Sequence, residues 1–173
     1  EFDGVGDYVD FGDIGDLDDG SVQLWFQASG TGLEQLLHKR DSGVHWGLAF
    51  FAEGEITNTT GQVLQLSYVA TAGTGYDGSN NSGADYQNWD YLNYENVLSN
   101  YWYHVIITRE NSTGTISMYV NGNLVAQNTN ATAGTPISNS NPLYLGTHNT
   151  NTGWLNGYAD ELAIWNDVLN PLE

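Results

Sequence analysis

Oxygen-rich and aromatic side chains gather between residues 76 and 96, which read YDGSNNSGADYQNWDYLNYEN. Amide and carboxylate groups hydrogen-bond sugar hydroxyls, while an aromatic ring stacks on the apolar face of a sugar. We therefore expect this segment to contact a ligand, through Asp77, Asn80, Asn81, Asp85, Trp89, Asp90 and Tyr91. The alternative is that its tyrosines and tryptophan pack together as the small core of a long loop.

The same composition favours calcium as a bound ion. Ca²⁺ takes roughly six to eight oxygen ligands, and the chain has 21 Asp and Glu but only four His and no Cys as softer ligands. In this segment we expect Asp85 and Asp90 to bind the ion. The run from Asp77 to Asn81 has the composition of a calcium loop but not the spacing of an EF-hand, so that motif is excluded.

Residue patterns of catalysis are missing from the sequence. There is no cysteine nucleophile, no Gly-x-Ser-x-Gly turn, no HExxH motif and no phosphate-binding loop. Glu53 and Glu55 share one strand parity, as a glycosidase pair would, but no third carboxylate follows them. Gly54 between them indicates the end of a hairpin. We expect a binding domain and not an enzyme.

Charge excludes nucleic acid as a partner, and the lack of a long apolar run argues against membrane insertion. Three Lys and Arg stand against 21 Asp and Glu, which gives a net charge of −18. Such a chain cannot neutralise phosphates, so nucleic acid is excluded. No apolar run approaches the roughly 18 residues of a membrane span, so we expect no direct membrane insertion. The adjacent Lys39 and Arg40 should pair internally with carboxylates.

Short apolar runs between polar turns predict strands, whereas Gly, Asn and Thr recur too often for long helices. The expected strands cover residues 21–28, 33–38, 46–51, 63–70, 102–109, 115–120, 124–127, 143–145 and 158–165. Leu64, Leu66 and Tyr68 should share one face of their strand. The fold class that follows is all-β, an antiparallel two-sheet β-sandwich, with residues 1–173 as a single domain.

Two connections between these strands are informative. The Asn121-Gly122 pair predicts a type I′ hairpin, which requires positive φ at both residues. Residues 71–100 show little strand periodicity and are expected to form a long loop that carries function. The polar loop of residues 148–154 ranks second as a ligand contact.

Three stretches of the chain resemble one family. They read FDGVGDYVD at 2–10, WYHVIITRENSTGTISMYVNGNLV at 102–125 and GYADELAIW at 157–165. Their order and motifs are similar to those of laminin G-like and pentraxin-like domains with the concanavalin A-like fold. The resemblance implies a jelly roll whose first and last strands pair. Residues then expected to alternate into the core are Trp102, Val105, Ile107, Met118, Val120, Leu162, Ile164 and Trp165.

The resemblance also implies a structural calcium ion near the paired chain ends, held by Asp3 and Asp160. Because neighbouring residues of a strand point to opposite faces, only one of Asp160 and Glu161 is expected to face such a site. The alternative is that Asp160 hydrogen-bonds backbone amides.

The function implied is that of a calcium-dependent module of an extracellular or cell-surface adhesin. It would bind a glycan or another cell-surface ligand, as a monomeric unit within a longer chain. The absence of cysteine suits secreted bacterial proteins. A structural or protein-binding spacer domain is the alternative, and a glycoside hydrolase is a third possibility.

Overall fold

Twelve strands make up the regular structure of the described residues in this computed structural model. The structure describes residues 1–15, 17–40, 45–56, 58–69, 90–129, 139–148 and 152–170. The strands are β1 (Phe2–Asp3), β2 (Val9–Asp10), β3 (Gly20–Ala28), β4 (Glu34–Arg40), β5 (His45–Phe51), β6 (Gln62–Val69), β7 (Asp90–Val97), β8 (Tyr103–Glu110), β9 (Thr115–Val120), β10 (Asn123–Asn128), β11 (Leu143–Leu145) and β12 (Asn156–Trp165). Among these residues no helix is long and apolar enough to cross a membrane.

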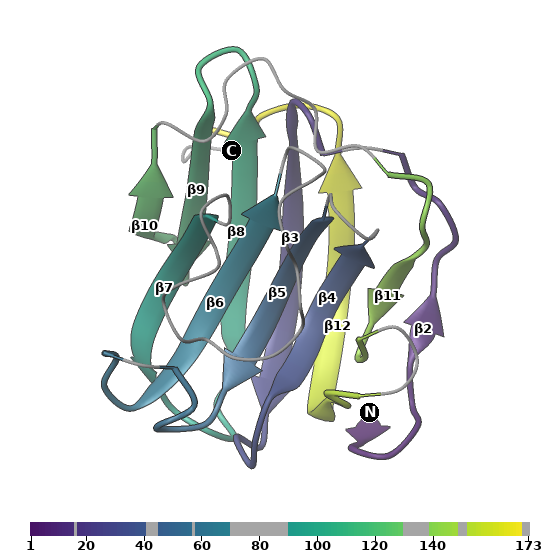
Figure 1. Cartoon of the computed structure of the whole chain (residues 1–173), viewed down its shortest axis with the longest axis vertical. Coiled ribbons are helices and arrows are strands. Elements are labelled where there is room, and N and C mark those ends of the chain that lie inside the picture. Colours follow the sequence, from purple (N-terminus) through teal and green to yellow (C-terminus); the bar gives the residue numbers. More distant parts are fainter. Residues whose placement is uncertain are drawn as a thin grey trace.

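The strands form two antiparallel sheets of six strands each. The first sheet has the order β1-β12-β3-β8-β9-β10, and the second has the order β2-β11-β4-β5-β6-β7. Figure 1 looks onto the second sheet, with the strands of the first sheet behind it. The predicted two-sheet sandwich is confirmed. The predicted pairing of the first and last strands is confirmed as well, because Phe2 of β1 is the register partner of Gly157 of β12.

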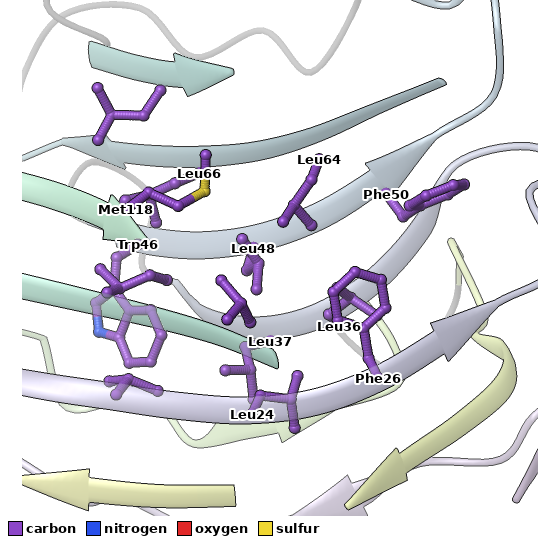
Figure 2. Packing of buried hydrophobic residues seen from close by; sticks show 14 of the residues in the cluster. Leu24, Phe26, Leu36, Leu37, Trp46, Leu48, Phe50, Leu64, Leu66 and Met118 are labelled. Atoms are coloured by element: carbon purple, nitrogen blue, oxygen red, sulfur yellow. The ribbon is translucent and has the colours of Figure 1, made fainter. Parts of the chain in front are cut away.

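The core lies between the sheets and follows from the alternation along each strand. In β3, Leu24 and Phe26 are buried, and in β6 the predicted face of Leu64, Leu66 and Tyr68 is buried. Figure 2 shows these leucine and phenylalanine side chains pointing into one shared layer. The Phe26 ring meets the Phe50 ring edge-on, with 6.3 Å between centroids.

Part of the predicted core lies elsewhere. Val105, Ile107, Met118 and Val120 are buried, and Leu162 packs against the core, while Trp165 is half-buried. The prediction for Trp102 is wrong, because this residue is 45% exposed. It precedes β8, whose first residue, Tyr103, stacks its ring on Phe26. The prediction for Ile164 is also wrong, because this residue is 40% exposed. It lies near the end of β12, where the sheet edge is open because the short β1 pairs only with Asn156 and Gly157.

The Asn-Gly hairpin has the predicted geometry. Asn121 and Gly122 have φ values of 50° and 78° between β9 and β10, as a type I′ turn requires. Asn121 Oδ1 also accepts a hydrogen bond from the His104 amide at 2.9 Å, which ties the turn to β8.

The prediction of a long loop over residues 71–100 is wrong for its last part, because residues 90–97 form β7 at the edge of the second sheet. Leu92 and Tyr94 pack toward the core, and Asn93 between them faces outward. Asn93 accepts a hydrogen bond from Gln65 of β6 at 2.9 Å. Asn, Asp and Glu are depleted in strands, and their frequency here hid the alternation.

Lys39 of β4 is fully buried and joins three segments. Its Nζ donates to Asp13 Oδ1 at 2.8 Å, to the Asn139 carbonyl at 2.9 Å and to the Asn141 carbonyl at 2.7 Å. The predicted internal pairing is therefore confirmed for Lys39, while the Arg40 side chain lies outside the described part of the structure.

Arg109 of β8 is the second buried cation. Its Nη1 donates to the Leu17 carbonyl at 2.9 Å, and Nη2 donates to Asn111 Oδ1 at 3.2 Å. Burial lowers the pKa of Arg109, and the nearby Asp18 and Asp19 oppose that shift. The guanidinium stays charged, and it holds the segment before β3 against the end of β8.

Candidate functional site

Trp25 lies at the centre of the outer face of the first sheet. Leu24 and Phe26 of β3 face the core, so Trp25 between them faces outward. Its register partners are Asp160 on β12 and His104 on β8, strands that flank β3 in Figure 1. The indole stacks on the His104 ring, with 4.9 Å between centroids and 20° between planes. These neighbours fix the position of the indole.

A second indole, that of Trp102, reaches the same face from the segment before β8. The turn that carries it is held to β3: the Asn100 amide donates to the Ala28 carbonyl at 2.7 Å, and Gln27 Nε2 donates to the Asn100 carbonyl at 2.8 Å. The Trp102 ring lies 6.2 Å from the Tyr158 ring of β12, centroid to centroid. Both rings are exposed, Trp102 by 45% and Tyr158 by 41%.

A β-bulge in β12 brings two consecutive carboxylates to this face. The register with β3 shifts between Asp160 and Ala163, and Glu161 has a φ of 50°. A bulge re-aims a side chain that regular alternation would send to the other face. The expectation that only one of Asp160 and Glu161 faces a site is therefore wrong, because both line the same hollow.

Trp25, Trp102, Asp160 and Glu161 line an open hollow of about 270 Å³. Ligand pockets commonly hold about 300–1,000 Å³, so this hollow suits a small ligand or one part of a larger one. The indoles offer flat apolar faces, and the carboxylates accept hydrogen bonds from hydroxyl or ammonium groups. The arrangement can therefore hold a polar ligand that has one apolar face.

The carboxylates around the hollow have few internal bonds. Asp160 Oδ1 accepts a hydrogen bond from the Glu161 amide at 2.8 Å, which confirms the alternative role expected for Asp160. Glu1 Oε1 accepts one from the Tyr158 hydroxyl at 3.3 Å. Within the described residues, Lys39 and Arg109 are held by their own acceptors away from this face. The rim is therefore negatively charged.

Two of the ligand residues predicted from sequence lie in the described part of the chain, and both belong to the second sheet. Tyr91 lies in β7 of the second sheet, opposite Ser67, and Asp90 is the first residue of that strand. Tyr91 is not part of the hollow, and the Asp90 side chain lies outside the described part of the structure. Asp77, Asn80, Asn81, Asp85 and Trp89 lie outside the described residues. Their contact with a ligand stays a prediction.

Asp3 and Asp160 do not fit a shared calcium ion. Asp3 is the register partner of Asn156, which precedes Asp160 by four residues on β12. Four residues of strand span about 13 Å, too far for one ion to bind both carboxylates directly. Asp3 Oδ1 instead accepts a hydrogen bond from the Val5 amide at 2.8 Å. In the described ranges no group of three His, Asp or Glu gathers around one point, and a site that uses Asp85 or Asp90 stays a prediction.

A second aromatic group lies at the other sheet, around β2 and β11. The Tyr8 ring lies 5.9 Å from the Tyr144 ring and 6.1 Å from the Trp154 ring, centroid to centroid. The ring centroids of His38 on β4 and of His148, which follows β11, lie 4.3 Å apart. Trp154, from the 148–154 loop that ranked second, therefore supplies a ring to this group, and the described residues of that loop do not line the hollow.

Sequence reasoning missed the hollow because it assigned Trp102 to the core and gave Trp25 no role. For Trp25 a signal was present: in the run Gln-Leu-Trp-Phe-Gln, burial of Leu24 and Phe26 requires Trp25 to point outward. For Trp102 a signal was also present, because it has the opposite strand parity from Val105 and Ile107, which were expected in the core. For Glu161 there was none, because the bulge is formed without a glycine.

Comparison with known proteins identifies the family. Residues 3–173 match the concanavalin A-like lectin/glucanases superfamily. The chain belongs to this superfamily. No curated protein sequence matches this concanavalin A-like domain.

Solved structures share its fold at low sequence identity. The carbohydrate-binding module CBM40 of the Ruminococcus gnavus IT-sialidase has a TM-score of 0.63 and 15% identity, over 95% of this chain and 92% of that one. A SAP-like pentraxin from Limulus polyphemus has a TM-score of 0.65 and 13% identity, over 98% and 76%. Domain 4 of the arabinanase AbnA from Geobacillus stearothermophilus, solved with arabinotriose, has a TM-score of 0.61 and 18% identity, over 95% and 69%.

Proposed function

We propose that this concanavalin A-like domain binds carbohydrate in the hollow on the outer face of its first sheet. The observation that carries the proposal is the meeting of two indoles and two carboxylates around one open hollow. A sugar presents an apolar face to the rings and hydroxyl groups to the carboxylates. Domains of similar fold named above are a carbohydrate-binding module and a domain solved with arabinotriose, which supports a glycan as the ligand class.

Binding without catalysis is part of the proposal. Glu53 and Glu55, the pair that shares strand parity, lie in the turn that follows β5, where Gly54 has a φ of 85°. Asp160 and Glu161 are consecutive in one bulge on a single strand. A glycosidase instead places its two carboxylates on opposite sides of the scissile bond.

A calcium requirement and a place on an extracellular adhesin complete the proposal. Both rest on the sequence, through its net charge of −18 and the acidic segment before β7. The calcium part is tested by titrating the glycan in calcium and again in excess chelator. Equal affinities in both would show that calcium is not required, and they would leave the hollow as the binding site.

The central test is Trp102→Ala, compared on a glycan array and then by calorimetric titration of the best glycan. Loss of a stacked ring should weaken binding by about 1–3 kcal/mol, by analogy with base stacking on aromatic residues. Because Trp102 lies outside the core, the melting temperature should change little. Tyr101→Ala is the matched control, since this neighbouring ring is 61% exposed and does not line the hollow.

The outcomes separate the alternatives. Full affinity in Trp102→Ala would remove the hollow from the binding site and return attention to residues 77–89. A wild-type domain that binds no glycan, with calcium or without it, would refute the proposal and favour the structural spacer.

A further inference from the structure

We propose that the hollow selects a cationic sugar, namely an amino sugar whose ammonium group is not acetylated. The inference rests on the proposed function and names its ligand class. Its basis is the combination of two aromatic faces and two carboxylates in one hollow, lined by Trp25, Trp102, Asp160 and Glu161.

The charge of the hollow excludes anionic sugars. Asp160 and Glu161 line it. The structure describes the side chains of two cations, Lys39 and Arg109. Both are buried among their own hydrogen-bond acceptors, so neither is available to bind a sugar carboxylate. A uronic or sialic acid would meet repulsion from every charged group that lines the hollow.

The rings favour a cation as well. An ammonium group over an indole face is attracted by the negative face of the ring, and tryptophan is the strongest partner of this kind. An ammonium group also has three donors, so it can bond both carboxylates and still face a ring. Acetylation of the amine removes its charge and with it both attractions.

The backbone conformation of Glu161 is what directs a second carboxylate to the hollow. Its φ of 50° lies in the left-handed region, which residues other than glycine rarely adopt. Such strain tends to persist at functional sites, where the surrounding structure holds it in place. Here the Gln23 side chain donates to the Glu161 carbonyl at 3.4 Å, and the bulge turns Glu161 to the same side as Asp160.

The probes are a glucosamine trimer and an N-acetylglucosamine trimer, titrated calorimetrically at a pH where the free amines are protonated. We expect the free-amine trimer to bind roughly 5- to 30-fold more tightly, the range from an exposed to a desolvated cation–π contact. Glu161→Gln should reduce this ratio toward one, and Trp102→Ala should weaken both sugars.

General attraction to a chain of net charge −18 is the main confounder. Glu53→Gln controls for it, because it removes one exposed carboxylate from a turn of the other sheet and changes the net charge equally. It should leave the ratio unchanged. A ratio that falls equally in Glu53→Gln and Glu161→Gln would overturn the inference.

Failure of the inference and failure of the proposed function differ in outcome. Cation selection would be overturned if both trimers bound with equal affinity, or if an anionic glycan bound more tightly. If Trp102→Ala still weakened binding in either case, glycan binding in the hollow would stand. If no glycan of any charge binds, both are overturned.

Discussion

Replacing Lys39 by methionine should destabilise the domain strongly. The substitution keeps the length and apolar stem of the side chain but removes the ammonium group, which lies fully buried between β4 and two other segments. Three hydrogen bonds are lost at once, from Nζ to Asp13 Oδ1 and to the carbonyls of Asn139 and Asn141.

The magnitude follows from what remains after the change. Each backbone carbonyl that loses its donor in a buried place costs about 1–3 kcal/mol, and two carbonyls are affected. Asp13 is 48% exposed, so water can solvate its carboxylate and its share is small. The methionine side chain recovers part of the loss through packing. We expect a net destabilisation of about 3 kcal/mol, which for a domain of this size lowers the melting temperature by about 6–12 °C.

Thermal unfolding followed by circular dichroism at neutral pH measures this shift. Asp13→Asn is the matched comparison, because it keeps the ammonium group and both carbonyl bonds and should lower the melting temperature much less. If Lys39→Met melts within about 2 °C of the wild type, the reasoning that Lys39 holds the 139–141 segment to β4 is refuted.

Three further predictions concern stability. Gly122→Val should cost about 1–2 kcal/mol, because the φ of 78° is unfavourable for a side chain even though no atom lies within 4 Å of the added Cβ; an unchanged melting curve would contradict the turn assignment. The hydrogen bond from Lys39 holds the pKa of Asp13 below its ordinary value of 3.8. This contribution is complete above that pH and is lost as the pH falls through the lower folded pKa, so Asp13→Asn should flatten the acid decline in melting temperature. Excess chelator should lower the melting temperature if the folded state binds calcium, because it removes a stabilisation of about 2.7 kcal/mol for an ion at a hundredfold excess over its Kd; no shift would exclude a stabilising ion.

The sequence was sufficient for the elements that alternate clearly. Leu24 and Phe26 in β3, and Leu64 and Leu66 in β6, are separated by residues that face away from the core, so strand and face follow together. The Asn121-Gly122 pair determined its turn through local backbone preference alone.

The candidate site was less predictable because it depends on small shifts in register. The bulge at Glu161 shifts the register with β3 by one residue and reverses one side chain, without a glycine to mark it. The strand β7 was hidden by its polar composition, although Leu92 and Tyr94 alternate within it. Such features arise from contacts between strands distant in sequence, which no local pattern contains.

The burial of Lys39 gives the domain a built-in reporter of its own unfolding. Lys39 is the chain's single lysine, and its amine is fully covered. Reagents that acylate lysine side chains can reach Lys39 only when the sandwich opens. Trypsin faces the same barrier at Lys39 and at Arg109, because both lie within paired strands. The rate of Lys39 labelling in dilute reagent therefore measures the equilibrium population of the open state under native conditions, without denaturant and without an added probe.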